Sequence, residues 1–498
     1  MKGQGQLLSR LYELAIYNRK RDLAAQLKIE SIFKEPKPLL LEELELLRKK
    51  LLKYSKGKRA YFFALDFFIR SSVEPVQAIL NELMNGAKAQ VDKEEIPFLK
   101  IISWCQRQAN NKKRAKLERE ASALCKFLAP FSHSTWQATL RVVKEELHYQ
   151  NYFSFLEDKR GEDLKRGYKL ALNFLNDSSS LYFKNIKRWL STIPEPIELE
   201  VSTRYDAIFL LGLRYLDKFL NNRFKKGQCL EKILKLFSIL IPNENWLKIH
   251  FSKSGQDQAY CVPVKIPTDI HIIVCPINGF LDLEGLLHEL GHALFFLNNP
   301  ATLSLIDKDF YISFALCESY AFLFQLISMD YFFLTELLDL DDHLAQFLNN
   351  IHKMKLFTLA RRYASKTIIE YENFKQNRFS KGQDLYAKKM KDYTGFYYGK
   401  ETYLFDLMPD MYSLDYFEAF LASFSLKRIL VDNFGNRWFL NNNALLFLKN
   451  IFQQGNKLQL RDLLKNIFGI ELNYSDILNE DAIKNFNIKY VKKMAQKI

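Results

Sequence analysis

Three polar residues stand in an otherwise apolar run, LLHELGHALFFL (286–297): His288, Glu289 and His292. The chain has only eight histidines, and two of them lie four residues apart here. On a helix, residues four apart share a face, so both imidazoles can bind the same metal ion. Glu289 projects about a quarter-turn away, where its carboxylate can reach a metal-bound water without being a ligand. The H-E-x-x-H spacing therefore predicts a metal site for hydrolysis.

Zinc is the metal that this ligand type favours, although imidazole with carboxylate also accepts manganese or cobalt. Zinc held by three protein groups lowers the pKa of its bound water to about 7, which makes a nucleophile available at neutral pH. We expect Glu289 to accept the water's proton and return it to the leaving amine. The alternative interpretation is a buried helix whose two histidines are satisfied by hydrogen bonds.

The third ligand must come from farther along the chain. A metzincin would carry Gly and His at 295 and 298, where this sequence has Phe295 and Asn298. Glu318 instead lies in FALCESYAFLFQLI (314–327), and its helical neighbours three and four positions away are apolar. A buried carboxylate is very costly unless a cation relieves it, so we predict Glu318 as the third ligand.

Two other carboxylates, Asp307 and Asp309, are alternatives to Glu318. They lie in a polar stretch that is typical of a turn. We predict them to be solvent-exposed loop residues, which leaves His288, His292 and Glu318 as the ligand set.

The elements that hold these residues are predicted to be mostly helices. Glycine (18) and proline (13) are scarce in 498 residues, and segments such as 39–54 and 135–158 repeat apolar residues every three to four positions. Two prolines in TIPEPIELEVS (192–202) forbid a continuous helix, and helical periodicity resumes over 204–220. We predict an N-terminal helical lobe over 1–195 and a catalytic domain over 196–498.

One segment, AYCVPVKIPTDIHIIVC (259–275), differs in kind from the helices. Two β-branched runs flank Pro-Thr-Asp, which is the composition of a hairpin turn. Pro263 cannot donate to a ladder, so its strand is expected at an edge or an irregularity. The sequence thus predicts a mainly α-helical fold with a small antiparallel β-hairpin or sheet beside the HExxH helix.

The composition also bears on location. Six cysteines lie far apart with no C-x-x-C pair, and the polar N-terminus lacks the pattern of a secretory signal. We therefore expect reduced thiols and a cytoplasmic protein. The most apolar run, 311–338, is interrupted by Glu318, Gln325 and Asp330, so it is predicted to be a buried helix and no membrane span.

The chain is strongly basic, with a formal net charge of +15. Residues 1–60 alone carry 15 Lys and Arg against 7 Asp and Glu, and NNKKRAK (110–116) is a second basic run. Such patches can attract nucleic acid or an acidic membrane surface. Because no zinc finger, RNA-recognition aromatic motif or phosphate loop accompanies them, we expect solvated helix faces and no specific nucleic-acid partner.

Several segments together resemble the thimet oligopeptidase and oligoendopeptidase F family of gluzincin zinc metallopeptidases. The hairpin, the acidic pair Asp282 and Glu284, and the HELGH helix (258–294) are similar to the family's core, and CESYAFLFQ (317–325) resembles its third-ligand helix. Later segments that resemble the family are its helix pair (368–395), its tyrosine-bearing helix (411–430) and its closing glycine-plus-helix pattern (447–472). The resemblance covers roughly residues 200–480.

This resemblance implies two helical lobes around a deep channel that admits short unfolded peptides. It also implies that the hairpin's edge strand pairs with an extended substrate. Tyrosines of the late helix would hydrogen-bond the oxyanion; here Tyr412 is the expected donor, with Tyr416 on the same helix and Tyr403 just before it. The sequence departs from the family in having no histidine beyond His352, where the family carries one ahead of these tyrosines, and in replacing the glycine-rich loop.

The sequence therefore predicts a zinc-dependent oligopeptidase acting on short peptides, with water activated by Glu289. The alternative is a catalytically weak or inactive zinc-binding protein that binds peptide or an acidic polymer through its basic N-terminal region.

Overall fold

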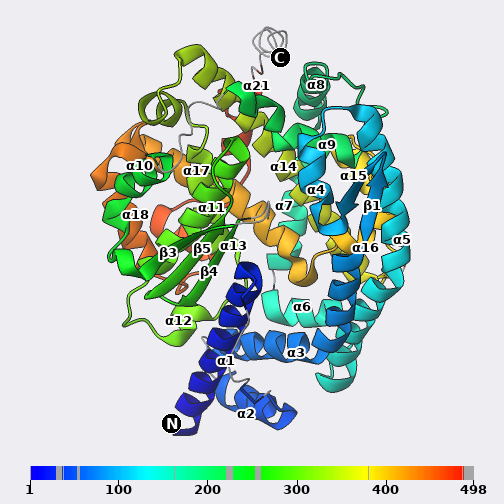
Figure 1. The fold of residues 1–498 in the computed structure, drawn as a ribbon. Helices are drawn as coiled ribbons and strands as arrows, with labels where there is room; N and C mark the ends of the chain where they lie inside the picture. The colour runs from blue at the N-terminus through cyan, green and yellow to red at the C-terminus, as the bar shows by residue number, and fades with distance from the viewer. Residues whose placement is uncertain are drawn as a thin grey trace. The chain divides into compact units, whose positions relative to one another are not determined.

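The computed structural model describes residues 2–29, 36–37, 39–52, 57–161, 163–219, 228–252, 259–379, 381–484 and 486. The fold is mainly helical, as predicted, and it contains two small sheets, of which only the one that includes residues 259–275 was predicted (Figure 1). The chain forms two compact units: unit 1 comprises Met1–Phe68, Leu220–Leu340 and Glu418–Leu472, and unit 2 comprises Ile69–Phe219, Asp341–Phe417 and Asn473–Ile498.

These units differ from the contiguous domains predicted over 1–195 and 196–498. The segment 192–202 is non-helical, as its prolines dictate, yet it lies within unit 2. Two long helices, α3 (Gly57–Gly86) and α17 (Tyr412–Phe434), run through the unit boundaries. Local breakers end helices, but they do not reveal which distant segments pack together.

Unit 1 combines helices from three parts of the chain with a three-stranded sheet. Its strands are β3 (Leu247–Phe251), β4 (Tyr260–Lys265) and β5 (Asp269–Val274). Besides its portions of α3 and α17, its α-helices are α1 (Lys2–Leu27), α2 (Leu41–Leu51), α10 (Gln228–Leu236), α11 (Phe280–Leu297), α12 (Leu305–Asp309), α13 (Ala315–Ile327), α18 (Asn442–Phe452) and α19 (Leu460–Phe468).

The predicted hairpin is formed by β4 and β5, which pair antiparallel. The strand order is β3-β5-β4, and β3, which the sequence analysis did not identify, adds in parallel to β5. Pro263 lies on the edge strand β4, where the register shifts between Pro263 and Lys265. Pro263 therefore lies both on an edge strand and at an irregularity, as expected. Because β3 pairs in parallel and β4 antiparallel with β5, the sheet is mixed.

The sheet is covered by helices of the same unit. Ile16, Leu23 and Leu27 of α1 pack against a cluster that includes Val262 and Val264 of β4. Helix α11 contacts β4 and β5 as well (Figure 1). Strand β5 is buried over nearly its whole length, as a central strand covered by helices should be.

Unit 2 is built on long helices and one short hairpin. Its strands are β1 (Lys88–Val91) and β2 (Glu94–Pro97). Besides its portions of α3 and α17, its α-helices are α4 (Ile101–Arg107), α5 (Asn111–Arg141), α6 (Tyr152–Arg160), α7 (Asp163–Asp177), α8 (Ser179–Leu190), α9 (Arg204–Gly212), α14 (Asp342–Lys375), α15 (Gln383–Thr394), α16 (Tyr403–Asp406), α20 (Ser475–Leu478) and α21 (Asp481–Lys484).

The β1–β2 hairpin corrects the expectation that the N-terminal lobe, residues 1–195, is built of helices alone. Ala89, Val91 and Ile96 are buried while their neighbours in the strands are exposed or partly exposed, which is the alternation of a half-buried strand. Asp92 adopts a positive φ of 55° in the connecting turn. An aspartate tolerates this conformation better than most residues, so the turn was a recognisable signal.

The helix predicted over 135–158 is also interrupted. Helix α5 ends at Arg141, a π-helical turn follows over Val142–Glu146, and α6 starts at Tyr152. Asn151 caps α6 by accepting a hydrogen bond from the Ser154 amide, and the Ser154 hydroxyl accepts one from the Asn151 amide. This capping box creates a new helix start inside an apolar pattern that is continuous in sequence.

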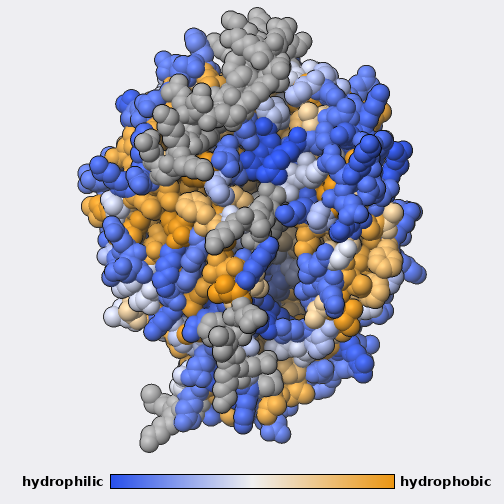
Figure 2. All heavy atoms as spheres, viewed as in Figure 1, coloured by the Kyte–Doolittle hydropathy of each residue, from blue (hydrophilic) through white to orange (hydrophobic). Residues whose placement is uncertain are grey.

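Within the apolar run 311–338, Ala315–Ile327 form the buried helix α13 and Phe333–Leu337 form a separate π-helical turn, so the predicted buried helix covers only part of the run. None of the described helices combines the length and apolar character that a membrane crossing requires. Figure 2 shows hydrophilic side chains spread across the drawn face, between patches of hydrophobic ones. All six cysteines are free thiols, as predicted.

Candidate metal centre

The HELGH segment lies on α11, a helix that is apolar on nearly every side. Its residues are buried except along one stripe, which includes Gly285, His288, Glu289 and His292. These positions recur at three- and four-residue intervals and therefore share one helix face. The polar residues that looked out of place in the sequence are gathered on the only face that is partly open.

Gly291 sets how closely α13 approaches α11. A Cβ built at Gly291 would lie 2.7 Å from the Ala321 Cα and 2.9 Å from the Tyr320 carbonyl oxygen. No side chain fits that space, so the glycine permits a backbone-to-backbone contact. This contact brings Glu318, on the first turn of α13, against the histidine face of α11.

Three side chains converge at this point. The His288 Nε2 lies 3.4 Å from the Glu318 Oε2, and the His292 Nε2 lies 3.5 Å from the same oxygen. One ligand atom of each residue lies within 4.8 Å of the others, and among the described residues this is the cluster of His, Cys, Asp and Glu that could hold an ion. The structure thus brings together the three residues that the sequence predicted as ligands.

The orientation of His288 is fixed by a hydrogen-bonded relay behind it. The His288 Nδ1 lies 2.8 Å from the Gln325 Oε1, and the Gln325 Nε2 donates to the Glu284 Oε1 at 2.7 Å. An amide oxygen only accepts, so this contact places a proton on Nδ1 and leaves Nε2 as the ring nitrogen that faces Glu318 and can bind a metal once it is deprotonated. Such outer partners characteristically orient metal-binding histidines.

The relay residues were not identified as functional from the sequence. Glu284, named above only as part of an acidic pair, belongs to α11 and is buried one turn before His288. Gln325 lies seven residues beyond Glu318, which is two helical turns along the same face of α13. Each relay residue thus lies one or two helical turns from a predicted ligand, on the same helix face. This spacing of four or seven residues was the sequence signal that could have identified them.

The electrostatics of the cluster favour a cation. Burial lowers the pKa of His288, but the hydrogen bond with Glu318 and the nearby charges of Glu289 and Glu318 outweigh it and raise the pKa to about 9. Burial raises the pKa of Glu318, but the two histidines outweigh it and hold the pKa well below its usual range. Two imidazoles and a carboxylate are a common ligand set of catalytic zinc, so these residues fit that ion.

Glu289 lies beside the cluster without joining it. Burial raises the pKa of its carboxyl group, opposed by His288 and His292, and the backbone of Cys261 on β4 hydrogen-bonds to it. The carboxylate is therefore held between the edge strand and the histidines. That position suits a proton acceptor for a water bound at the cluster.

The prediction that Asp307 and Asp309 are solvated loop residues is wrong. Both lie on the short helix α12 and are buried, with 4% and 1% of their surface exposed. Asp307 accepts a hydrogen bond from Arg59 at 2.6 Å, and Asp309 accepts one from Arg19 at 2.6 Å. Their charges are compensated by arginines from the N-terminal segment, which are distant in sequence.

Part of the basic surface is likewise paired internally. Arg19 and Arg59 belong to the basic first 60 residues, and Arg114 of the run 110–116 is buried against Asp206. Lys116 pairs with Asp92 of the β1–β2 turn. The number of basic residues in these two runs therefore overstates their unpaired positive surface, and binding of an acidic polymer there stays an untested prediction.

The tyrosines belong to unit 2 and differ from one another in exposure. Tyr412 and Tyr416, on the first turns of α17, are partly exposed, and their rings meet edge to face with centroids 4.7 Å apart. Tyr403 is buried with 3% of its surface exposed, and burial raises the pKa of its phenol. Tyr403 is thus a core residue, whereas Tyr412 stays the predicted oxyanion donor.

Solved structures with this arrangement of elements are peptidases. The chain is similar to PZ peptidase A solved with an inhibitor, with a TM-score of 0.61 and 12% identity over 97% of this chain and 87% of that one. A protein from Bacillus anthracis str. Ames assigned as oligoendopeptidase F gives a TM-score of 0.59 at 12% identity over 97% and 86%. The chain has the fold of oligoendopeptidase F.

A protein from Chlamydophila abortus assigned as a peptidase is similar as well, with a TM-score of 0.57 and 12% identity over 92% of this chain and 82% of that one. No protein-family model matches the sequence, and no curated protein sequence matches it either. The resemblance inferred from the sequence is therefore confirmed as one of fold. The chemistry has to be argued from the site itself.

Proposed function

We propose that this chain is a zinc-dependent oligopeptidase that hydrolyses peptide bonds in short, unfolded peptides. The observation that carries the proposal is the convergence of His288, His292 and Glu318, with His288 oriented by Gln325. The fold shared with oligoendopeptidase F and PZ peptidase A supports the same class of substrate.

In this proposal, the two Nε2 atoms of His288 and His292 and the carboxylate of Glu318 would hold the zinc ion. Zinc supplies Lewis acidity when bound, since it polarises a carbonyl group and lowers the pKa of water. Glu289 accepts the proton of the attacking water on its carboxylate and returns it to the leaving amine nitrogen. The buried relay from His288 through Gln325 to Glu284 keeps the imidazole in the tautomer that can bind metal.

The edge strand β4 is the proposed binding strand for the peptide. Its inner edge pairs with β5, and Cys261 on β4 is hydrogen-bonded to Glu289 through its backbone. A peptide that adds to the outer edge by β-augmentation would run past the general base. Main-chain pairing of this kind requires an extended substrate, which is consistent with unfolded peptides.

Tyr412 is the proposed donor to the oxyanion that forms when the carbonyl is attacked. Its phenol is partly exposed at the first residue of α17, whereas Tyr403 is buried. The chain has no histidine beyond His352 and so departs from the family here, and Tyr412 is proposed from the resemblance of its helix alone.

The test is digestion of a mixed peptide library, followed by mass spectrometry, with zinc-loaded wild type and zinc-loaded Glu289→Gln. We expect cleavage by wild type and a loss of roughly 10²- to 10⁴-fold in the variant, since general-base catalysis contributes about that much. Both proteins should contain equal zinc by elemental analysis. Glu244→Gln, at an exposed glutamate, is the control for losing one carboxylate. Undiminished cleavage by Glu289→Gln would contradict the assigned role.

A further inference from the structure

A strained turn immediately precedes Tyr412 in unit 2. Asp410 has φ 65° and ψ 15°, and Met411 has φ 56°, so two consecutive residues with side chains adopt left-handed conformations. Each such residue costs roughly 1–2 kcal/mol relative to the right-handed form. A turn of this kind persists only where its surroundings over-determine it, and such strain clusters at functional sites.

Helix α6 supplies the first set of contacts to this turn. The Lys159 ammonium pairs with the Asp410 carboxylate, and the Arg160 guanidinium donates to the Asp410 carbonyl oxygen at 2.7 Å. Arg160 also pairs with Asp415, one turn into α17. The Tyr152 hydroxyl accepts a hydrogen bond from the Asp410 amide at 2.9 Å. The backbone and side chain of Asp410 are therefore both held.

Helix α14 supplies a second set through one residue, Glu370. Its Oε1 accepts hydrogen bonds from the Ser413 hydroxyl at 2.7 Å and from the Met408 amide at 3.2 Å. Glu370 is 1% exposed, so these contacts are shielded from water. Met408 and Ser413 bracket the strained residues, and Ser413 directly follows Tyr412. Glu370 thus fixes both ends of the turn.

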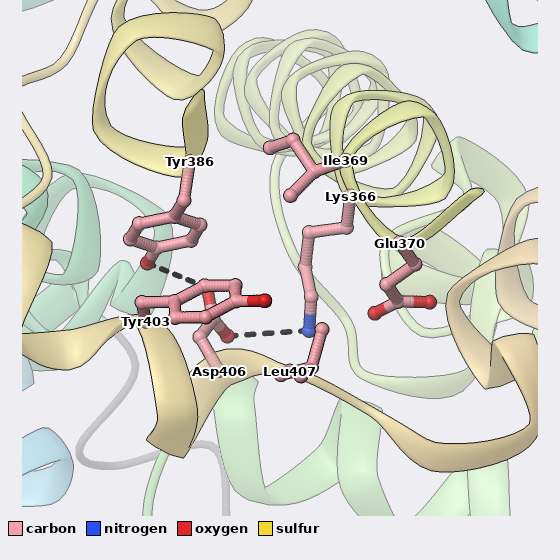
Figure 3. A pocket seen from close by; sticks show the side chains of 7 residues that line it. All are labelled: Lys366, Ile369, Glu370, Tyr386, Tyr403, Asp406 and Leu407. Carbon is pink, nitrogen blue, oxygen red and sulfur yellow. Dashed lines mark hydrogen bonds and ion pairs between the residues drawn. The ribbon is translucent and has the colours of Figure 1, made fainter. Parts of the chain in front are cut away.

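Figure 3 shows what surrounds the Glu370 carboxyl group. It lines a small cavity with Lys366 of α14, Tyr386 of α15 and Tyr403 of α16. Lys366 is already paired with Asp406, at 3.2 Å, and Tyr386 donates to Asp406 at 2.9 Å. The Glu370 carboxyl therefore lies among groups that are mostly paired with one another, and its own hydrogen bonds are directed to the turn.

We propose that Glu370 and Arg160 are positioning residues that hold the turn 408–413 and thereby fix Tyr412 at the start of α17. The inference rests on the proposed function, because it gives the turn the task of presenting the oxyanion donor. Two strained residues and buried contacts from two separate helices surround this partly exposed tyrosine. In this proposal, the role of Tyr412 therefore depends on Glu370 and Arg160, which are distant from it in sequence.

The kinetic test uses two substitutions that remove opposite ends of one hydrogen bond. Ser413→Ala and Glu370→Ala should each lower kcat on the order of 10- to 100-fold, the cost of misplacing a catalytic group, with KM little changed. Glu370→Gln keeps an oxygen that accepts from both donors and should restore kcat. The matched control is Ser365→Ala, because that buried hydroxyl on α14 bonds only the Arg361 carbonyl of its own helix.

A double-mutant cycle separates positioning from general damage. In a Tyr412→Phe background, Glu370→Ala should lower kcat no further, because the group that it positions is gone. An equal loss of kcat in both backgrounds would overturn the proposal, as would unchanged kcat for both Ser413→Ala and Glu370→Ala.

Hydrogen exchange tests the same proposal without using activity. In full-length zinc-loaded protein, Glu370→Ala should speed amide exchange in peptides covering 403–416 by about tenfold or more and leave α11 and α13 unchanged. Unchanged exchange over 403–416 would overturn the inference, and so would acceleration spread evenly over the chain. If wild type proves inactive, the proposed function fails while this measurement still decides whether Glu370 holds the turn.

Discussion

The turn 408–413 of unit 2, which contains Tyr412 and is called the tyrosine turn below, contrasts with the metal centre of unit 1. The two are built in opposite ways. The metal centre consists of two regular helices, α11 and α13, whose ligands follow helical spacing and meet because Gly291 permits close packing. The tyrosine turn consists of irregular backbone at Asp410 and Met411, held by charged residues of α6 and α14. The first depends on periodicity and one small residue, whereas the second depends on buried polar contacts over long sequence separations.

The largest expected effect comes from removing a ligand of the metal centre. His292→Ala should lose bound zinc and, with it, at least 10³-fold of the peptidase activity, because two protein ligands hold zinc far more weakly than three. Elemental analysis after gel filtration measures the metal, and peptide cleavage measures the activity. His250→Ala, at a partly exposed histidine of β3, is the control and should keep both. Retention of stoichiometric zinc by His292→Ala would refute the ligand assignment.

The next effect addresses the relay behind His288. Gln325→Leu keeps a similar volume but removes the acceptor for the His288 Nδ1 and a donor to Glu284. Zinc affinity should fall roughly 10- to 100-fold, the usual cost of losing a partner that orients a ligand. Competition with a chelator measures the affinity. Gln346→Leu, at an exposed glutamine of α14, should leave it unchanged; equal affinities for all three proteins would show that the relay does not orient the ligand.

A smaller effect tests the close packing of the two helices. Gly291→Ala places a methyl group against the Ala321 and Tyr320 backbone and should lower the free energy of unfolding by about 1–3 kcal/mol. Gly285→Ala on the same helix is the control, because its Cβ would lie 3.4 Å from the Ala259 Cβ, an ordinary contact. Both variants gain helix propensity equally, so thermal unfolding of the pair isolates the clash. If both melt alike, Gly291 is not what limits the approach of α13.

The smallest effect is the pH dependence of stability that arises from Glu370, which holds the tyrosine turn. Burial, opposed by Lys366, raises the pKa of Glu370 from 4.5 to about 7. The folded protein therefore binds this proton more tightly than the unfolded chain, and the associated stability is complete below pH 4.5 and lost as pH rises through 7. The contribution is on the order of 1–3 kcal/mol.

Glu370→Gln removes this titration, so its melting temperature relative to wild type should be higher at pH 8 than at pH 5. The metal centre is the same in both proteins, and its own pH dependence cancels in the comparison. A difference in melting temperature that does not change between pH 5 and pH 8 would show that the Glu370 pKa is not raised in the folded protein.

Much of the fold and of the metal centre could be predicted because both follow from sequence patterns within a single helix or hairpin. The β-branched runs and turn residues of 259–275 predicted the β4–β5 hairpin, and the four-residue spacing of His288 and His292 predicted a shared face. The apolar neighbours of Glu318 indicated a buried carboxylate, and the structure places it within 3.5 Å of both histidines. Each of these inferences required only the geometry of one helix or one hairpin.

Other features depended on partners that local patterns do not name. Asp307 and Asp309 read as exposed residues because the arginines that compensate them, Arg59 and Arg19, lie about 250 to 290 residues away. The interruption between α5 and α6 was missed because an apolar pattern alone does not distinguish a continuous helix from two capped ones. The β1–β2 hairpin was missed although Asp92 in its turn was a recognisable signal.

The sequence by itself determined the ligand types, their helical spacing and the mainly helical class, since these follow from the chain's own periodicity. Only the tertiary structure decided how closely α13 approaches α11, which side chains form the relay to Glu284, and how the turn before Tyr412 is held. The physical reason is that helix geometry is set within a few residues. Buried charges and left-handed residues, in contrast, are stabilised by whichever segments the whole fold brings beside them.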